Sequence, residues 1–262
     1  MASPTPPDQA IAEATKLLRG TPVFIAGSCV AAEAHGFDAF SDLDIFVPTE
    51  QMLISTVQHL LCEGYTIEDR FDRVWHRWLK YGLKGWRTNS MRLYSKQNVE
   101  TNVVFKIADD HATTTLSQVL ESFDFGLLAV GYDLEQGMRR DLRPYLFPGM
   151  DITGPLPLMP GRRDAWRNGF ISQYQGLREA ARYAKYHDYG YDMSAVKDDL
   201  VTGYQMVASY HLSKEDEDKQ LLGQIYTTLG DRIEHDEIDE LLTSYKTLDF
   251  RDSLDEIMEA LF

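Results

Sequence analysis

Two short groups of residues near the N-terminus have the types and spacing needed to bind a phosphorylated ligand together with a metal ion. Gly27 and Ser28 follow an apolar segment, and Asp42, fourteen residues after Ser28, is separated from Asp44 by one leucine. Because side chains alternate faces along a strand, the two acids point the same way. Adjacent carboxylates repel each other unless a cation lies between them, and Mg²⁺ (or Mn²⁺) suits oxygen ligands. The Gly-Ser turn offers backbone N–H groups and a hydroxyl to a phosphate.

Two neighbouring strands must bring these residues together. Residues 23–26 predict a strand that ends at the Gly-Ser turn, and residues 30–34 predict a short helix after it. In the second strand Leu43, Ile45 and Val47 alternate with the acids and would point into a core. A solvated hairpin with surface acids is the competing interpretation. The Asp pair, however, interrupts a segment that otherwise has the pattern of a buried strand.

The turn, the spacing and the Asp-x-Asp strand resemble the nucleotidyltransferase superfamily typified by DNA polymerase β. That family carries a Gly-Ser turn, an Asp-x-Asp strand and a third carboxylate on a later strand. The compact layout with a helical tail also resembles phage-encoded members. The resemblance implies an enzyme, dependent on Mg²⁺ or Mn²⁺, that moves an NMP from an NTP to a hydroxyl acceptor and releases pyrophosphate. Asp42 and Asp44 would be catalytic and hold the metal, while Gly27 and Ser28 would bind the nucleotide's phosphates.

The third carboxylate that the resemblance implies has two candidate positions on a predicted strand over residues 99–107. Glu100 and Asn102 share one face of that strand by alternation. Glu100 is the predicted third catalytic residue, which would polarise the acceptor hydroxyl and help to hold a second metal. If Asn102 takes that position instead, the site lacks a general base and one negative charge, because an amide is neutral.

A second group of candidate residues shares one face of a helix predicted over residues 163–187. Stepped at about 100° per residue, five cations and a tyrosine form one stripe; they are Arg163, Arg167, Tyr174, Arg178, Arg182 and Lys185. Cations of this kind could bind a triphosphate, and the tyrosine could stack on a base. We predict that the stripe, apart from Lys185, binds the nucleotide. Pairing with the acidic C-terminal helices is the alternative.

The pattern along the chain changes from mixed strands and helices to helices alone. Besides the site elements, we expect helices over residues 8–20, 49–63 and 113–123, a hairpin within 73–95 and a strand over 127–132. A loop at 151–161 with three prolines marks a boundary. Helices follow over 163–187, 193–211, 215–229 and 234–262. This order predicts an α+β fold: a nucleotidyltransferase-like mixed β-sheet with helices in domain 1–150 and a helical C-terminal domain in 151–262.

Composition and charge limit the class of protein and its partners. The composition is that of a soluble globular protein without a membrane span, so we expect no membrane partner. Two cysteines, Cys29 and Cys62, are too few for a disulfide framework, which favours a reducing cytoplasm. The net charge is −15, of which residues 214–262 contribute −10. These acidic C-terminal helices are a candidate surface for a protein partner, while the rest of the chain does not exclude RNA.

The residues leave the acceptor and one competing class open. The acceptor could be an RNA end, a protein or a small molecule, and a toxin that blocks tRNA by adding nucleotides is one enzymatic alternative. The competing class is a binding protein on a catalytically decayed nucleotidyltransferase scaffold, for example a viral inhibitor with an acidic surface. Asn102 and the acidic C-terminal segment favour this second class.

Overall fold

The computed structural model describes residues 5–76, 86–108, 111–167 and 173–211. Its internal contacts define two compact units, Met1–Thr153 and Gly154–Phe262. The division falls in the proline-containing loop at which the sequence predicts a boundary. None of the described helices is both long and apolar enough to cross a membrane. A cytoplasmic location stays a prediction.

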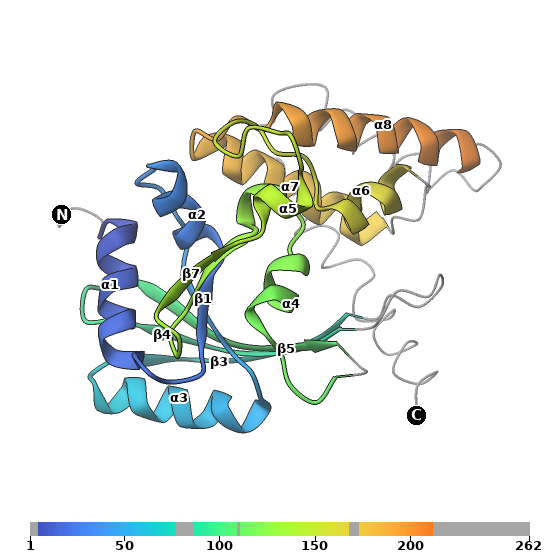
Figure 1. Cartoon of the computed structure of the whole chain (residues 1–262). Coiled ribbons are helices and arrows are strands. Elements are labelled where there is room, and N and C mark those ends of the chain that lie inside the picture. Colours follow the sequence, from blue (N-terminus) through green and yellow to red (C-terminus); the bar gives the residue numbers. More distant parts are fainter. Residues whose placement is uncertain (1–4, 77–85, 109–110, 168–172, 212–262) are drawn as a thin grey trace, which may run out of the picture. The chain divides into compact units, whose positions relative to one another are not determined.

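The first unit is built on one mixed sheet (Figure 1). Within the described residues the sheet has seven strands in the order β3-β4-β5-β2-β1-β6-β7. Only β2 and β5 pair in parallel among these described strands; the other neighbours are antiparallel. The strands are β1 (Phe24–Ala26), β2 (Leu43–Val47), β3 (Thr66–His76), β4 (Trp86–Tyr94), β5 (Glu100–Ala108), β6 (Val130–Asp133) and β7 (Met138–Asp141). β2, which carries Asp44 and begins directly after Asp42, therefore lies inside the sheet between β1 and β5.

Helices cover both faces of this sheet. α1 (Pro7–Leu18) and α3 (Glu50–Cys62) share a hydrophobic cluster with Ile45. α4 (Leu116–Glu121) packs on the opposite face, in a cluster with Phe46. Successive residues of β2 thus enter different clusters, as the alternation of side chains along a strand requires.

The second unit is described through three helices. They are α6 (Pro160–Arg167), α7 (Gln173–Asp188) and α8 (Ser194–His211). The Trp166 indole is 2% exposed and donates its N–H to the carboxylate of Glu179, which is 1% exposed. A buried carboxylate needs such partners because its charge is costly to remove from water.

The predicted α+β class is confirmed, and most elements of the first unit lie where the sequence predicts them. The sequence prediction missed two short elements, β7 and α5 (Arg143–Leu146), which have four residues each and carry many exposed side chains. Segments of this kind lack the apolar periodicity on which prediction depends. The helix predicted over 163–187 is described as α6 and α7. Residues 168–172 between them, and the helices predicted beyond residue 211, lie outside the described residues.

Candidate functional site

The Gly27–Ser28 turn leads the chain from β1 into α2 (Ser28–His35). Gly27 has φ +95°, a backbone conformation that residues with a Cβ rarely adopt. A Cβ atom at this position would lie 2.5 Å from the Oδ2 atom of Asp44. The glycine therefore lets the Asp44 carboxylate approach the start of a helix, where backbone N–H groups point outward.

Two serine hydroxyls hold Asp42 beside this turn. The Oγ atom of Ser28, whose residue is 4% exposed, lies 3.3 Å from Asp42 Oδ1. The hydroxyl of Ser41 donates to the same oxygen, and the Ser41 backbone N–H donates to Ser28 Oγ over 3.3 Å. These contacts join the turn to the carboxylate pair. Ser41 is not among the site residues predicted from the sequence, although its position directly before Asp42 could have indicated it.

The side-chain amide of Asn102 contacts both carboxylates. Asp44 of β2 lies opposite Asn102 of the parallel strand β5. The Asn102 Nδ2 atom is 2.5 Å from Asp42 Oδ2 and 3.2 Å from Asp44 Oδ1. An amide nitrogen has two N–H donors, so it can serve both acids and offset part of their repulsion. The register thus puts Asn102 directly beside Asp44.

Glu100 lies two residues earlier on the same face of β5 and is paired with an arginine. Its Oε1 atom is 2.9 Å from the Nε atom of Arg92, and the two side chains are 30% and 32% exposed. Arg92 itself lies on β4 opposite Asn102. The catalytic role of Glu100 stays a prediction. Arg92 is a second residue of this sheet face, and its place beside Asn102 follows from the strand register, which the sequence does not specify.

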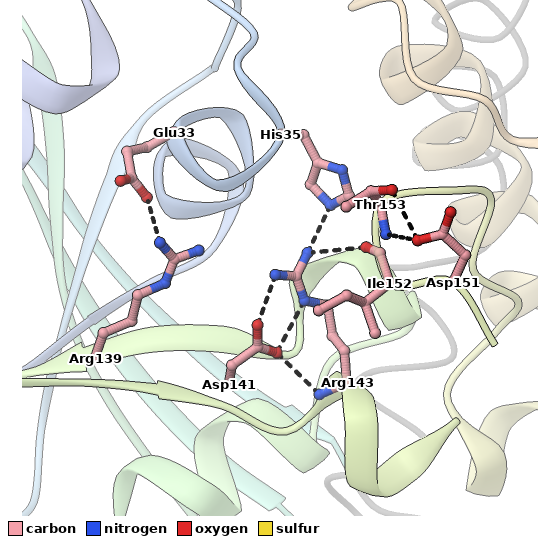
Figure 2. A network of polar contacts seen from close by, with 8 residues as sticks. All are labelled: Glu33, His35, Arg139, Asp141, Arg143, Asp151, Ile152 and Thr153. Carbon is pink, nitrogen blue, oxygen red and sulfur yellow. Dashed lines mark hydrogen bonds and ion pairs between the residues drawn. The ribbon is translucent and has the colours of Figure 1, made fainter. Parts of the chain in front are cut away.

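A buried arginine anchors the far end of α2 (Figure 2). The Arg143 side chain is 4% exposed, and its Nε and Nη2 atoms lie 2.9 Å and 2.7 Å from the two carboxylate oxygens of Asp141. Its Nη1 atom lies 2.8 Å from Nε2 of His35, the last residue of α2. Because a guanidinium only donates, His35 Nε2 accepts and the imidazole is neutral. Burial and then the charge of Arg143 lower the pKa of His35 to about 4.

This anchor fixes α2 at the end opposite to the Gly27–Ser28 turn. Figure 2 also shows Glu33 of the same helix against Arg139 of β7, with 3.5 Å between Oε2 and Nη1. For Asp141, burial alone would raise the carboxyl pKa, but the hydrogen bonds and charge of Arg143 outweigh burial and lower it. The sequence offered no signal for the contact between His35 and Arg143, because the two residues are 108 positions apart in the chain.

Cys29 lies directly after Ser28 and belongs to the core. Its side chain is fully buried, and the thiol lies 3.6 Å from the Pro7 carbonyl oxygen. Burial, followed by the charges of Asp44 and Asp42, raises the pKa of the Cys29 thiol far above its ordinary range. Cys29 is thus a small buried apolar residue and not a nucleophile.

The carboxylate pair fits a divalent cation such as Mg²⁺. Among the described residues, no group of three or more His, Cys, Asp or Glu side chains could hold a metal ion. Mg²⁺ is, however, commonly bound by one or two carboxylates, with waters and substrate phosphates as the remaining ligands. Asp42, Asp44 and the Ser28 hydroxyl supply oxygen atoms, and the Asn102 amide can turn its oxygen toward a cation. This donor set has the hard-oxygen chemistry that Mg²⁺ or Mn²⁺ requires.

The stripe of cations predicted on the C-terminal side lies in the second unit. Arg163 of α6 contacts Asp199 of α8, with 2.7 Å between Nε and Oδ1. Arg182 lies on α7 and is half-buried. Arg167, Tyr174 and Arg178 also fall in α6 and α7, but their side chains lie outside the described part of the structure. Asp199 lies outside residues 214–262, so pairing of the stripe with the acidic C-terminal helices stays a prediction, as does nucleotide binding by the stripe.

The chain was compared with protein families, curated proteins and solved structures. No family and no curated protein matches it. One similar solved structure is the apo form I of a CCA-adding enzyme, at 16% sequence identity and a TM-score of 0.38. The match covers 82% of this chain and 51% of that chain, so this chain spans about half the length of that structure. A likeness this low carries no conclusion about activity, so function must be inferred from the site itself.

Proposed function

We propose that this protein is a metal-dependent nucleotidyltransferase that moves an NMP from an NTP to a hydroxyl acceptor. The observation that carries the proposal is the approach of Asp44 to Gly27, where a Cβ would lie 2.5 Å from the carboxylate. The start of α2 and the carboxylate pair thereby form one site. A helix N-terminus favours an anion, and a carboxylate pair favours a divalent cation. A metal-bound triphosphate carries a phosphate anion and a divalent cation side by side, so it matches both parts of the site.

Each residue of the site has a defined part in this reaction. Asp42 and Asp44 hold the cation, which when bound neutralises charge on the phosphates. The Ser28 hydroxyl and the N–H groups of the first turn of α2 bind phosphate oxygens. These contacts are stronger in the transition state, where charge develops on those oxygens. Gly27 contributes by having no side chain.

The chemical step is a displacement at the α-phosphorus. The acceptor oxygen forms a bond to that phosphorus, and the bond from it to the bridging oxygen breaks. Pyrophosphate leaves with the bonding electron pair. The hydroxyl proton passes to the carboxylate of Glu100, which lies on the same sheet face as Asp44 and Asn102. The acceptor class is an RNA end, a protein or a small molecule.

A second candidate function follows from Asn102. Its amide lies beside Asp44, where a further carboxylate would add a ligand and a base. A protein that binds a nucleotide without turnover does not need that further carboxylate. On this scaffold it would act as an acidic binding or inhibitor protein. Such a protein binds an NTP with Mg²⁺ but transfers nothing. The acidic segment that would meet its partner lies beyond residue 211, outside the described residues.

Label transfer from α-labelled NTPs with Mg²⁺ tests the proposal. Total RNA, a protein lysate and a small-molecule extract are offered as separate acceptors. The proposal predicts that label moves to one fraction, which then defines the acceptor class. The Asp42→Asn, Asp44→Asn double variant should abolish that transfer while keeping the fold, because each substitution keeps the side-chain shape.

Two other outcomes decide against transfer. Absence of label in every fraction, with a folded protein that still binds Mg·NTP, favours the binding protein. Transfer that survives in the double variant rules out this site as the catalytic centre.

A further inference from the structure

Three side chains follow one another across the sheet beside the candidate site. Asp44 on β2 lies opposite Asn102 on β5, and Asn102 lies opposite Arg92 on β4. Directly opposed residues of neighbouring strands share a sheet face, and neighbouring strands lie about 4.8 Å apart. Arg92 is therefore about 10 Å from Asp44 between Cα atoms, on the same face as the carboxylate pair.

The charges along this row differ from those that two cations would need. A pair of divalent cations requires carboxylates on more than one side to offset their repulsion. On the β5 side of Asp44 the next side chain in the row is the neutral amide of Asn102, and the one after it is the guanidinium of Arg92. The Glu100 carboxylate nearby is paired with that guanidinium, with 2.9 Å between Oε1 and Nε. The row thus supplies a cation where a second metal ion would need an anion.

We infer that Arg92 binds a phosphate oxygen of the nucleotide and supplies the positive charge on the Asn102 side of the site. The site then holds one divalent cation for each nucleotide. The inference rests on the proposed function, because it takes the ligand to be a metal-bound NTP. A guanidinium suits this part because its planar fork of N–H donors can contact a carboxylate and a phosphate together.

Binding of a non-hydrolysable α,β-methylene ATP in the presence of Mn²⁺ tests the inference without any need for turnover. Electron paramagnetic resonance counts the bound Mn²⁺ ions for each bound nucleotide, and calorimetry gives the nucleotide affinity. We expect one Mn²⁺ in the wild type. Arg92→Ala should weaken nucleotide binding by about tenfold or more, the scale of a lost charge-assisted hydrogen bond. Arg92→Lys should restore part of the affinity, since it keeps the charge but not the fork.

Two further variants separate ligand binding from a structural role. Glu100→Gln removes the partner of Arg92 without removing its charge. The Glu100→Gln variant should bind the nucleotide as tightly as the wild type or more tightly. If the ion pair had only a structural role, the variant would bind it as weakly as Arg92→Ala does. Arg140→Ala is the matched control, because Arg140 lies at the other edge of the same row and contacts Ser117 over 2.9 Å. This control should bind as the wild type does.

The outcomes distinguish the inference from the proposed function. Two Mn²⁺ ions in the wild type, or unchanged affinity in Arg92→Ala, overturns the inference and leaves the proposed function standing. Failure of the wild type to bind the Mn²⁺-nucleotide complex at all overturns both.

Discussion

Asn102 and Asp44 lie opposite each other on neighbouring parallel strands, and the Asn102 Nδ2 atom is 3.2 Å from the Asp44 carboxylate. The same nitrogen lies 2.5 Å from Asp42. An amide thus bridges the two acids that the sequence assigns to a metal. It donates to both carboxylates, adds no negative charge of its own and cannot act as a base.

Gly27→Ala should damage the site more than it damages the fold. The new Cβ would lie 2.5 Å from Asp44 Oδ2 at a residue with φ +95°. We expect a stability loss of about 1–3 kcal/mol from backbone strain and the displaced carboxylate, together with loss of Mg·NTP binding. Chemical denaturation and nucleotide titration measure the two effects.

Gly36→Ala is the matched control for this substitution. Gly36 follows α2 with φ +72°, and a Cβ added there would meet nothing within 4 Å. It should cost about 1 kcal/mol for the left-handed backbone and leave nucleotide binding unchanged. Equal losses of nucleotide affinity in both variants would contradict the role assigned to the approach of Gly27 to Asp44.

The two cysteines should differ sharply in reactivity. Cys62 is exposed, whereas Cys29 is fully buried and the pKa of its thiol is raised by burial and by nearby carboxylates. Since the thiolate is the reactive form, a thiol reagent at pH 8 should modify Cys62 alone in the native protein. Mass spectrometry of the Cys62→Ser variant checks this. Rapid modification of Cys29 in that folded variant would show that the core beside the Gly-Ser turn is open.

His35 should make the stability of the first unit depend on pH. Burial and Arg143 lower its pKa to about 4 in the folded protein, while the unfolded chain takes up a proton near pH 6.5. The unfolded state binds more protons between these values, so stability should fall as the pH falls from 6.5 toward 4. We expect this loss to be about 1–2 kcal/mol, because the partly exposed ring is screened by solvent.

Urea unfolding of the wild type and of His35→Gln at pH 7 and pH 5 measures this contribution. The glutamine carbonyl can accept from Arg143 but does not titrate. The variant should therefore lose less stability on acidification than the wild type. His111→Gln, at an exposed histidine, serves as the control and should behave as the wild type does. An identical pH dependence in His35→Gln would contradict the neutral, buried state of His35.

Arg163→Ala separates a structural role of Arg163 within the second unit from nucleotide binding by the basic stripe. Arg163 Nε lies 2.7 Å from Asp199, a carboxylate that is 3% exposed and also accepts from the Leu158 N–H over 3.1 Å. Loss of the arginine should destabilise the second unit by about 1.5–3 kcal/mol, the scale of a hydrogen bond to a charged group. If the side chain also binds nucleotide, affinity falls as well. Thermal unfolding and nucleotide titration of the variant separate the two roles.

Local patterns allowed much of the fold and the Asp pair to be predicted from the sequence. Leu43 and Ile45 of β2 alternate with Asp42 and Asp44, and Thr49 caps α3 by accepting from the Met52 N–H over 3.3 Å. Such features depend on residues that are close in the chain. The contacts of Asn102 and Arg92 depend on which strands pair and in what register, and no local pattern specifies these. Arg143 reaches His35 across 108 positions, which the sequence alone does not indicate.

In the proposed function, the Gly27–Ser28 turn and the Asp42–Asp44 pair together hold a metal-bound nucleoside triphosphate. Calorimetric titration with α,β-methylene ATP tests it most directly, with Mg²⁺, with EDTA, and with the Asp42→Asn, Asp44→Asn double variant. Binding should require Mg²⁺ and should weaken by about a hundredfold or more in the double variant, since two charged ligands of the cation are lost. Binding of equal strength in EDTA or in the double variant would contradict it.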